Sequence, residues 1–135
     1  MIIEVLKPWV DFGLLVLILM VQVIVYPSFT YYSKIDLVQW HQTYTPRITA
    51  IVAPLMMTQV AMHAYTLLFD FSYVEIVQTV LIVAVWLITF IYFVPLHQKI
   101  EARQNNTTDL KNLISYNWLR TIIWFLIVLF NLTEL

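Results

Sequence analysis

The sequence predicts an all-α, four-helix transmembrane bundle, and three observations point to this class. Of its 135 residues, 61% are hydrophobic and only 11% are charged, a balance typical of membrane proteins rather than of soluble domains. Apolar runs of about 20 residues, the length that an α-helix needs to cross a bilayer, recur along the chain. These runs are too long, and alternate too little, for the strands of a membrane β-barrel. Because the spans use nearly the whole chain, residues 1–135 are predicted to form one four-span membrane domain.

We expect the four helices at about residues 8–32, 45–69, 73–103 and 109–133. Pro8 suits the first turn of the first helix, where a missing N–H costs nothing. Residues 33–44 are mixed in character and are predicted to form a connection with a short helix at the membrane interface. Thr45 and Pro46 form a cap-plus-proline start for the second helix. A tight turn leads into the third helix, and the polar residues 105–109 cap the fourth.

The distribution of basic residues predicts the orientation. The two longer connections are flanked by Lys34, Arg47, Lys99, Arg103, Lys111 and Arg120, whereas Lys7 stands alone on the opposite side. By the positive-inside rule both connections lie in the cytoplasm and both termini on the non-cytoplasmic side. We therefore expect a multi-pass protein of the bacterial cytoplasmic (inner) membrane, with the lipid bilayer as its first partner. The net charge of −1 argues against a nucleic-acid partner, and the lack of cysteine excludes thiolate metal sites.

Arg120 lies within the fourth span, where a charge is costly in hydrocarbon and therefore marks a functional site by default. It shares a helix face with Asn117 and Trp124, which predicts a polar stripe turned into the bundle. The alternative is that Arg120 snorkels to the lipid headgroups. Arg47 is predicted in the first turn of the second helix. The partial positive charges at the N-termini of the second and fourth helices would then add to the charges of both arginines. Together they would form a site for an anion, or for an oxygen that becomes negative in a reaction.

His97 ends the third span, and His41 lies beside Trp40 at the same predicted membrane level. An imidazole titrates near neutral pH, so either histidine could act as a general base; the alternative is ordinary interfacial hydrogen bonding. His63 lies 16 residues beyond Arg47, roughly 24 Å deeper along the second helix, and is expected to make an interhelical hydrogen bond near Gln59. No helix carries a His-x-x-x-His or Glu-x-x-His pair, so we predict no metal site. We predict no cofactor either, with a haem held by His41 and His97 as the alternative.

Pro27, Pro54 and Pro95 all lie near the predicted cytoplasmic ends of their helices. Proline frees a carbonyl and bends a membrane helix, which is tolerated where neighbours or water satisfy the freed group. One interpretation is ordinary proline usage in membrane helices. The other is a vestibule that opens toward the cytoplasm, and the sequence alone leaves both open.

Two segments carry a resemblance to a known family. Residues 93–100 (FVPLHQKI) and 116–121 (YNWLRT) are similar in spacing to the Val-Pro-Leu-Asn and Trp-Asn-x-x-Arg signatures of the anthrone oxygenase-like family of small four-helix membrane proteins. The four-span plan and the proline late in the first helix (Tyr26-Pro27) agree, whereas His97 stands where the family pattern has asparagine. The resemblance implies cofactor-free insertion of O2 into an anthrone-type polyketide, giving the quinone. It also implies that His97, Asn117 and Arg120 line the functional pocket.

The sequence thus yields a main hypothesis and two alternatives. The main hypothesis is an anthrone-type monooxygenase with a polar pocket at the cytoplasmic side and a hydrophobic aromatic ligand. Its candidate catalytic residues are His97, His41, Arg120 and Asn117, and its candidate substrate-binding residues are Arg47, Trp40, Tyr116, Trp118 and Trp124. The first alternative is a non-catalytic subunit or assembly factor that binds other membrane subunits. The second is a haem- or quinone-binding four-helix protein.

Overall fold

The computed structural model describes residues 2–133 and consists of four long helices, each long and apolar enough to cross a membrane. This confirms the predicted fold class of a four-helix transmembrane bundle. Two of the long helices are divided by short segments of different helical pitch. In chain order the elements are α1 (Ile2–Met20), η1 (Val21–Val25), α2 (Tyr26–Ser28), η2 (Phe29–Tyr31), α3 (Lys34–Phe69), α4 (Tyr73–Ile88), η3 (Thr89–Phe93), α5 (Val94–Glu101) and α6 (Thr107–Thr133).

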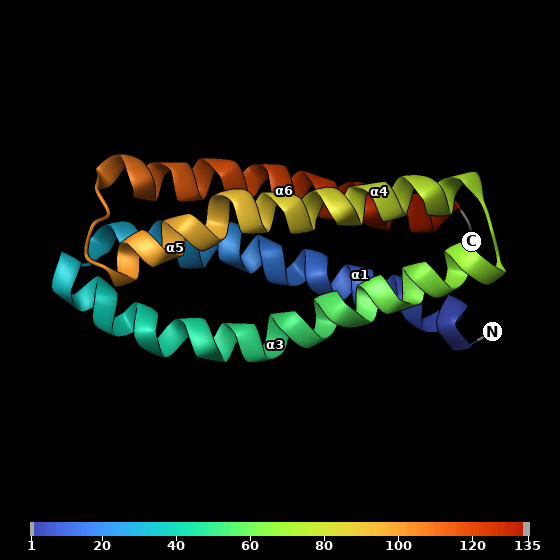
Figure 1. Cartoon of the computed structure of the whole chain (residues 1–135), viewed down its shortest axis with the longest axis horizontal. Coiled ribbons are helices and arrows are strands. Elements are labelled where there is room, and N and C mark those ends of the chain that lie inside the picture. Colours follow the sequence, from blue (N-terminus) through green and yellow to red (C-terminus); the bar gives the residue numbers. More distant parts are fainter. Residues whose placement is uncertain (1, 134–135) are drawn as a thin grey trace.

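The long helices run side by side, and each packs against two neighbours. Helix α1 contacts α3 and α6, and α4 contacts the same two helices. Figure 1 shows both described chain ends at one end of the bundle, together with the turn between α3 and α4. The connections from η2 to α3 and from α5 to α6 lie at the opposite end, where the basic residues gather. We call the end with the chain termini the terminal end and the other the basic end.

Helix α3 begins eleven residues earlier than the sequence interpretation placed it. The Ser33 hydroxyl accepts a hydrogen bond from the Asp36 backbone N–H and donates one to the Asp36 carboxylate, a reciprocal cap that starts a helix at Lys34. The predicted break before Pro46 is therefore wrong. Both Pro46 and Pro54 lie inside one continuous helix of 36 residues, because a membrane helix tolerates proline where its freed carbonyl finds another partner.

The other helix starts also depend on local hydrogen bonds. Helix α1 begins at Ile2, so Pro8 lies inside the helix rather than in its first turn. At the start of α6, the Asn106 side chain accepts from the Asp109 N–H, and the Asp109 carboxylate accepts from the Asn106 N–H. These polar residues form the expected cap of the fourth helix. Lys99 reaches across the connection and forms an ion pair with Asp109 at 3.0 Å.

Two prolines are each preceded by a five-residue π-helical segment. η1 ends two residues before Pro27, and η3 ends two residues before Pro95. A proline ring clashes with the carbonyl four residues earlier and donates no hydrogen bond, and here the backbone widens, so that the Val94 N–H bonds to the oxygen of Thr89, five residues back. A π-turn shifts the face that all later residues present, and such turns recur at functional sites.

Candidate functional site

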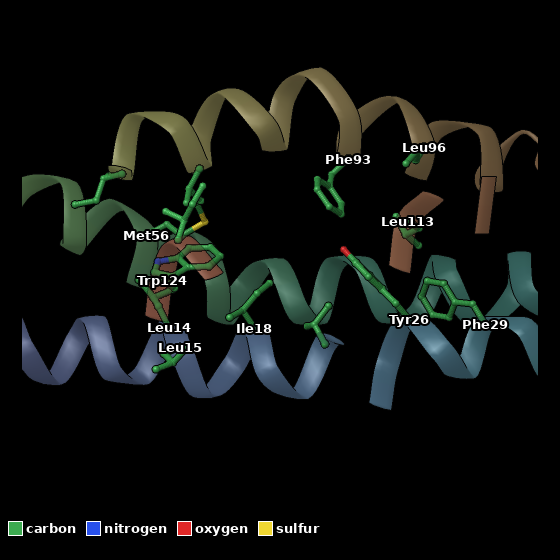
Figure 2. Packing of buried hydrophobic residues seen from close by; sticks show 14 of the residues in the cluster. Leu14, Leu15, Ile18, Tyr26, Phe29, Met56, Phe93, Leu96, Leu113 and Trp124 are labelled. Carbon is green, nitrogen blue, oxygen red and sulfur yellow. The ribbon is translucent and has the colours of Figure 1, made fainter. Parts of the chain in front are cut away.

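A cavity of about 410 Å³ lies between α3 and the helix formed by α4, η3 and α5, with its floor on α1 and α6. Figure 2 shows six residues that line it: Leu14, Ile18, Tyr26, Met56, Phe93 and Trp124. The Tyr26 hydroxyl and the Phe93 ring point into the space between the helices. The lining is mostly apolar, and its polar side chains include Tyr26, Tyr44, His97, Glu101 and Arg120. The cavity is therefore an apolar chamber with one polar end.

Arg120 forms the charged part of this polar end. The residue is only 8% exposed, so its side chain does not snorkel to the headgroups. The guanidinium carbon lies 4.2 Å from the centre of the Phe93 ring and 5.6 Å from that of Trp124, and the group interacts with the Tyr26 hydroxyl. Within residues 2–133 no carboxylate pairs with Arg120, and its Nε has no hydrogen-bond partner. A buried cation without an anion is poised to bind one.

The predicted meeting of His41, His97 and Arg120 occurs, with Tyr26 between the last two. His97 Nε2 lies 3.1 Å from the Tyr26 hydroxyl oxygen, and His97 Nδ1 lies 2.6 Å from His41 Nε2. Both nitrogens of His97 are thus engaged with neighbours. His41 is fully buried on α3 and reaches Glu101 on α5, whose side chain is 48% exposed, at 3.2 Å. The Tyr26 hydroxyl and the His97 imidazole therefore lie together at the polar end of the cavity.

Asn117 is placed differently from the other candidate catalytic residues. It is buried on the face of α6 that packs on η1, where its amide N–H group donates to the Gln22 side chain at 2.9 Å. Gln22 in turn donates to the backbone oxygen of Ile114. The Asn117 oxygen is buried without a partner, but an oxygen accepts hydrogen bonds and cannot stabilise an enolate. Its contacts therefore assign Asn117 to the packing of α6 against η1.

Of the candidate substrate-binding residues, only Trp124 lines the cavity. Trp40, Arg47, Tyr116 and Trp118 are exposed on the outer surface of the helices. The prediction that the partial positive charge of a helix N-terminus adds to each of Arg47 and Arg120 is wrong. Because α3 begins at Lys34, Arg47 lies in mid-helix. Arg120 lies about 20 Å from the start of α6, and the effect of a helix terminus fades within one turn.

A second polar cluster, which we call the terminal network, is buried near the terminal end. Lys7 Nζ contacts Glu75 Oε2 at 2.6 Å, and the other Glu75 oxygen lies 2.6 Å from His63 Nδ1. His63 Nε2 lies 3.2 Å from Asp11, which confirms an interhelical hydrogen bond for His63. The Asp11 carboxylate also accepts hydrogen bonds from Gln59 at 2.7 Å and from Asn131 at 2.8 Å. This network joins all four long helices, and its charges are paired.

The haem alternative does not fit this arrangement. An iron between two imidazoles needs nitrogens about 4 Å apart, since metal–nitrogen distances are near 2 Å, whereas His41 and His97 are hydrogen-bonded at 2.6 Å. Within the described part of the chain, no group of three or more histidine or acidic side chains is arranged to hold a metal ion.

Sequence reasoning missed Tyr26, Lys7 and Glu75. A tyrosine near the end of a span suggests an interfacial anchor, and charges near helix ends suggest a solvated surface. One signal for the position of Glu75 was available, because Ser72-x-x-Glu75 is a pattern that caps a helix start. The Ser72 hydroxyl does accept a hydrogen bond from the Glu75 backbone N–H. The Glu75 side chain, however, turns inward to Lys7 and His63.

No protein-family model, curated protein or solved structure matches the chain.

Proposed function

We propose that this membrane protein is a cofactor-free, oxygenase-like enzyme that binds a flat, hydrophobic ligand of the anthrone type. The observation that carries the proposal is the buried guanidinium of Arg120, without an anionic partner, at the polar end of an apolar cavity. Such a cation stabilises an oxygen that becomes negative in a transition state, because it is already oriented and little water screens it. The side chains of Tyr26 and His97 supply proton-transfer groups at the same place.

The size and lining of the cavity suit a fused aromatic ligand. Pockets for small molecules measure roughly 300–1,000 Å³, with mainly apolar walls and a few polar groups that fix orientation, and this one measures about 410 Å³. Phe93 and Trp124 offer ring faces beside Arg120. Phe90 and Val94 line the cavity and are also exposed on the outside of the bundle, so a hydrophobic ligand can enter from the bilayer.

The proposed reaction needs only O2 as a co-reactant. Removal of a proton from the anthrone carbon gives an enolate, whose oxygen Arg120 holds. The enolate passes one electron to O2, and the resulting superoxide and carbon radical join in a C–O bond. The peroxide takes up one proton, and the hydroperoxide then loses water as its O–O bond and the remaining C–H bond break. One anthrone and one O2 thus yield one anthraquinone and one water.

A quinone- or quinol-binding protein is the second candidate, and one observation favours it. A further apolar groove of about 390 Å³ lies between α3 and α4 and shares Trp86 and Phe90 with the cavity. A ring bound at Arg120 could extend an isoprenoid tail along this groove. Stronger binding of a tailed quinone than of its tail-less head group would favour this candidate over the enzyme.

The test measures anthrone oxidation by the purified protein in lipid nanodiscs. The wild-type protein should consume O2 and form anthraquinone faster than empty nanodiscs, which report spontaneous oxidation. Arg120→Met should lower the rate above background by about 10²–10³-fold, the usual effect of removing one oxyanion-stabilising group. Arg47→Gln, which removes an exposed cation from α3, is the matched control and should retain the wild-type rate. A wild-type rate equal to that of empty nanodiscs would refute the enzyme.

The predicted location in a bacterial cytoplasmic membrane, with both termini outside, belongs to the same proposal. Its support is the gathering of lysine and arginine at the basic end. The polar end of the cavity would then lie on the cytoplasmic side of the bundle.

A further inference from the structure

Four side chains form an unbroken file from the cavity to the surface of the bundle. The Tyr26 hydroxyl lies 3.1 Å from His97 Nε2, and His97 Nδ1 lies 2.6 Å from His41 Nε2. His41 Nδ1 lies 3.2 Å from Glu101 Oε1. Tyr26 and Glu101 both line the cavity, but Tyr26 is only 4% exposed whereas the Glu101 side chain is about half exposed. The two ends of the file therefore face different surroundings.

The hydrogen bonds in this file can all point the same way. A carboxylate only accepts, so His41 donates to Glu101 from Nδ1 and must accept at Nε2. His97 then donates to His41 from Nδ1 and accepts from the Tyr26 hydroxyl at Nε2. The Arg120 guanidinium beside the Tyr26 oxygen favours this direction, because it only donates. Each imidazole thus donates once and accepts once, which is the arrangement that a proton relay needs.

We propose that Tyr26, His97, His41 and Glu101 form a proton relay between the cavity and the membrane surface. The inference rests on the proposed function for the source of the proton. When the ligand gives a proton to the Tyr26 oxygen, the Tyr26 proton moves to His97 Nε2. The Nδ1 proton of His97 moves to His41 Nε2, and the Nδ1 proton of His41 moves to Glu101. One proton leaves the ligand, one arrives at Glu101, and no intermediate charge remains on either imidazole.

The proposed reaction also resets the relay. After one transfer every hydrogen bond in the file points back toward the cavity, so a second proton cannot follow in the same direction. The peroxide formed from O2 needs a proton, and the reverse hops supply it from Glu101 through Tyr26. The original orientation returns with each turnover.

The surroundings of the file favour transfer through side chains over transfer through water. His41 is fully buried, and the Phe29 and Tyr44 rings pack around it. The Thr45 hydroxyl lies 3.2 Å from His41 Nδ1 and helps to hold the ring. The charged groups that face the file are Glu101 at its outer end and Arg120 at its inner end. A proton from the cavity therefore has a defined path and a defined exit.

A purely structural role for the same hydrogen bonds makes a different prediction. Glu101→Gln keeps an oxygen that accepts from His41 but removes the group that takes up the proton. A structural hydrogen bond survives this change, whereas a relay loses its exit. Glu101→Asp keeps the carboxylate and should restore transfer. Asp70→Asn removes the same charge from an exposed side chain at the terminal end and serves as the matched control.

The experiment measures exchange of imidazole protons with water by NMR of protein labelled with 15N-histidine in nanodiscs. The chain has three histidines, so His97→Gln assigns the signals, and His63 in the terminal network is an internal reference. Glu101→Gln should slow exchange at His97 by at least about tenfold, since a positioned acid–base group contributes about 10²–10⁴-fold to proton transfer. His63 exchange and the unfolding midpoint should not change, and Asp70→Asn should match the wild type.

Wild-type exchange at His97 in Glu101→Gln would overturn the relay. So would equal slowing in Glu101→Gln and Glu101→Asp, because a carboxylate would then have no special role. The measurement needs no ligand and no turnover, so its result is separate from that of anthrone oxidation. A working relay without oxidation refutes only the proposed enzyme, and oxidation with unchanged exchange refutes only the relay.

Discussion

The two buried polar clusters should differ strongly in how much stability the protein loses when one of their charges is removed. Asp11 in the terminal network accepts hydrogen bonds from Gln59 and Asn131 and lies against His63. Arg120 lies against two aromatic rings and pairs with no carboxylate of the described chain. Asp11→Asn should therefore destabilise the folded protein strongly, and Arg120→Met should change its stability little.

The contacts give the expected magnitudes. Asparagine at position 11 replaces an accepting oxygen with an N–H group that faces donors, and hydrogen bonds to charged groups contribute about 1.5–3 kcal/mol each. With a buried imidazole left poorly paired, we expect Asp11→Asn to lower the free energy of unfolding by about 3 kcal/mol. An arginine at mid-membrane destabilises the folded protein by about 2.5–3.5 kcal/mol. Its contacts with aromatic rings, when desolvated, stabilise it by about 2 kcal/mol, and the contact with Tyr26 adds to this stabilisation. Arg120→Met should therefore stay within about 1 kcal/mol of the wild type.

The assay is reversible unfolding in mixed dodecylmaltoside and SDS micelles, followed by tryptophan fluorescence. A loss of about 3 kcal/mol lowers the folded-to-unfolded ratio by roughly 150-fold, since 1.4 kcal/mol is tenfold. Asp70→Asn, at an exposed carboxylate of the same end, is the control and should match the wild type. If Arg120→Met lost as much stability as Asp11→Asn, Arg120 would be a structural residue and the assignment of different roles to the two clusters would be wrong.

Three further outcomes are expected. Asn117→Ala removes the hydrogen bond to Gln22 and should cost about 0.6–1.7 kcal/mol, the range for interhelical hydrogen bonds in membranes, while anthrone binding by calorimetry stays unchanged; tenfold weaker binding would place Asn117 in the site. Lys99→Gln breaks a partly exposed ion pair and should change the free energy of unfolding in micelles by less than about 1 kcal/mol; a larger loss would show a structural role. In sealed cells an impermeant maleimide should label Asp70→Cys and not Gln104→Cys, and the reverse would invert the topology.

The sequence was sufficient for the fold class and for the inward face of Arg120, because both follow from the energetics of the bilayer. Hydrocarbon selects apolar spans of fixed length, and it drives an ionised side chain in mid-span toward the bundle interior. The meeting of His41, His97 and Arg120 was expected from their shared membrane level. These features depend on residue type and depth more than on details of packing.

The start of α3 and the role of Tyr26 depend on details that periodicity does not encode. Two start signals compete near α3, and the reciprocal cap of Ser33 prevails over Pro46 because proline is tolerated within a membrane helix. The widened turn before Pro27 changes the face presented by the residues after it, so their direction cannot be counted from a regular helical period. The burial of Glu75 likewise depends on its tertiary partners.

The most direct test of ligand binding at Arg120 is a density map of the protein in nanodiscs with anthrone, collected without O2. We predict planar density in the cavity, with the ligand oxygen toward the guanidinium and one ring beside Phe93 or Trp124. The same experiment with Arg120→Met should leave the cavity without this density. Anthrone found among the lipids outside the bundle, or a cavity filled by an acyl chain in the presence of anthrone, would contradict a ligand site at Arg120.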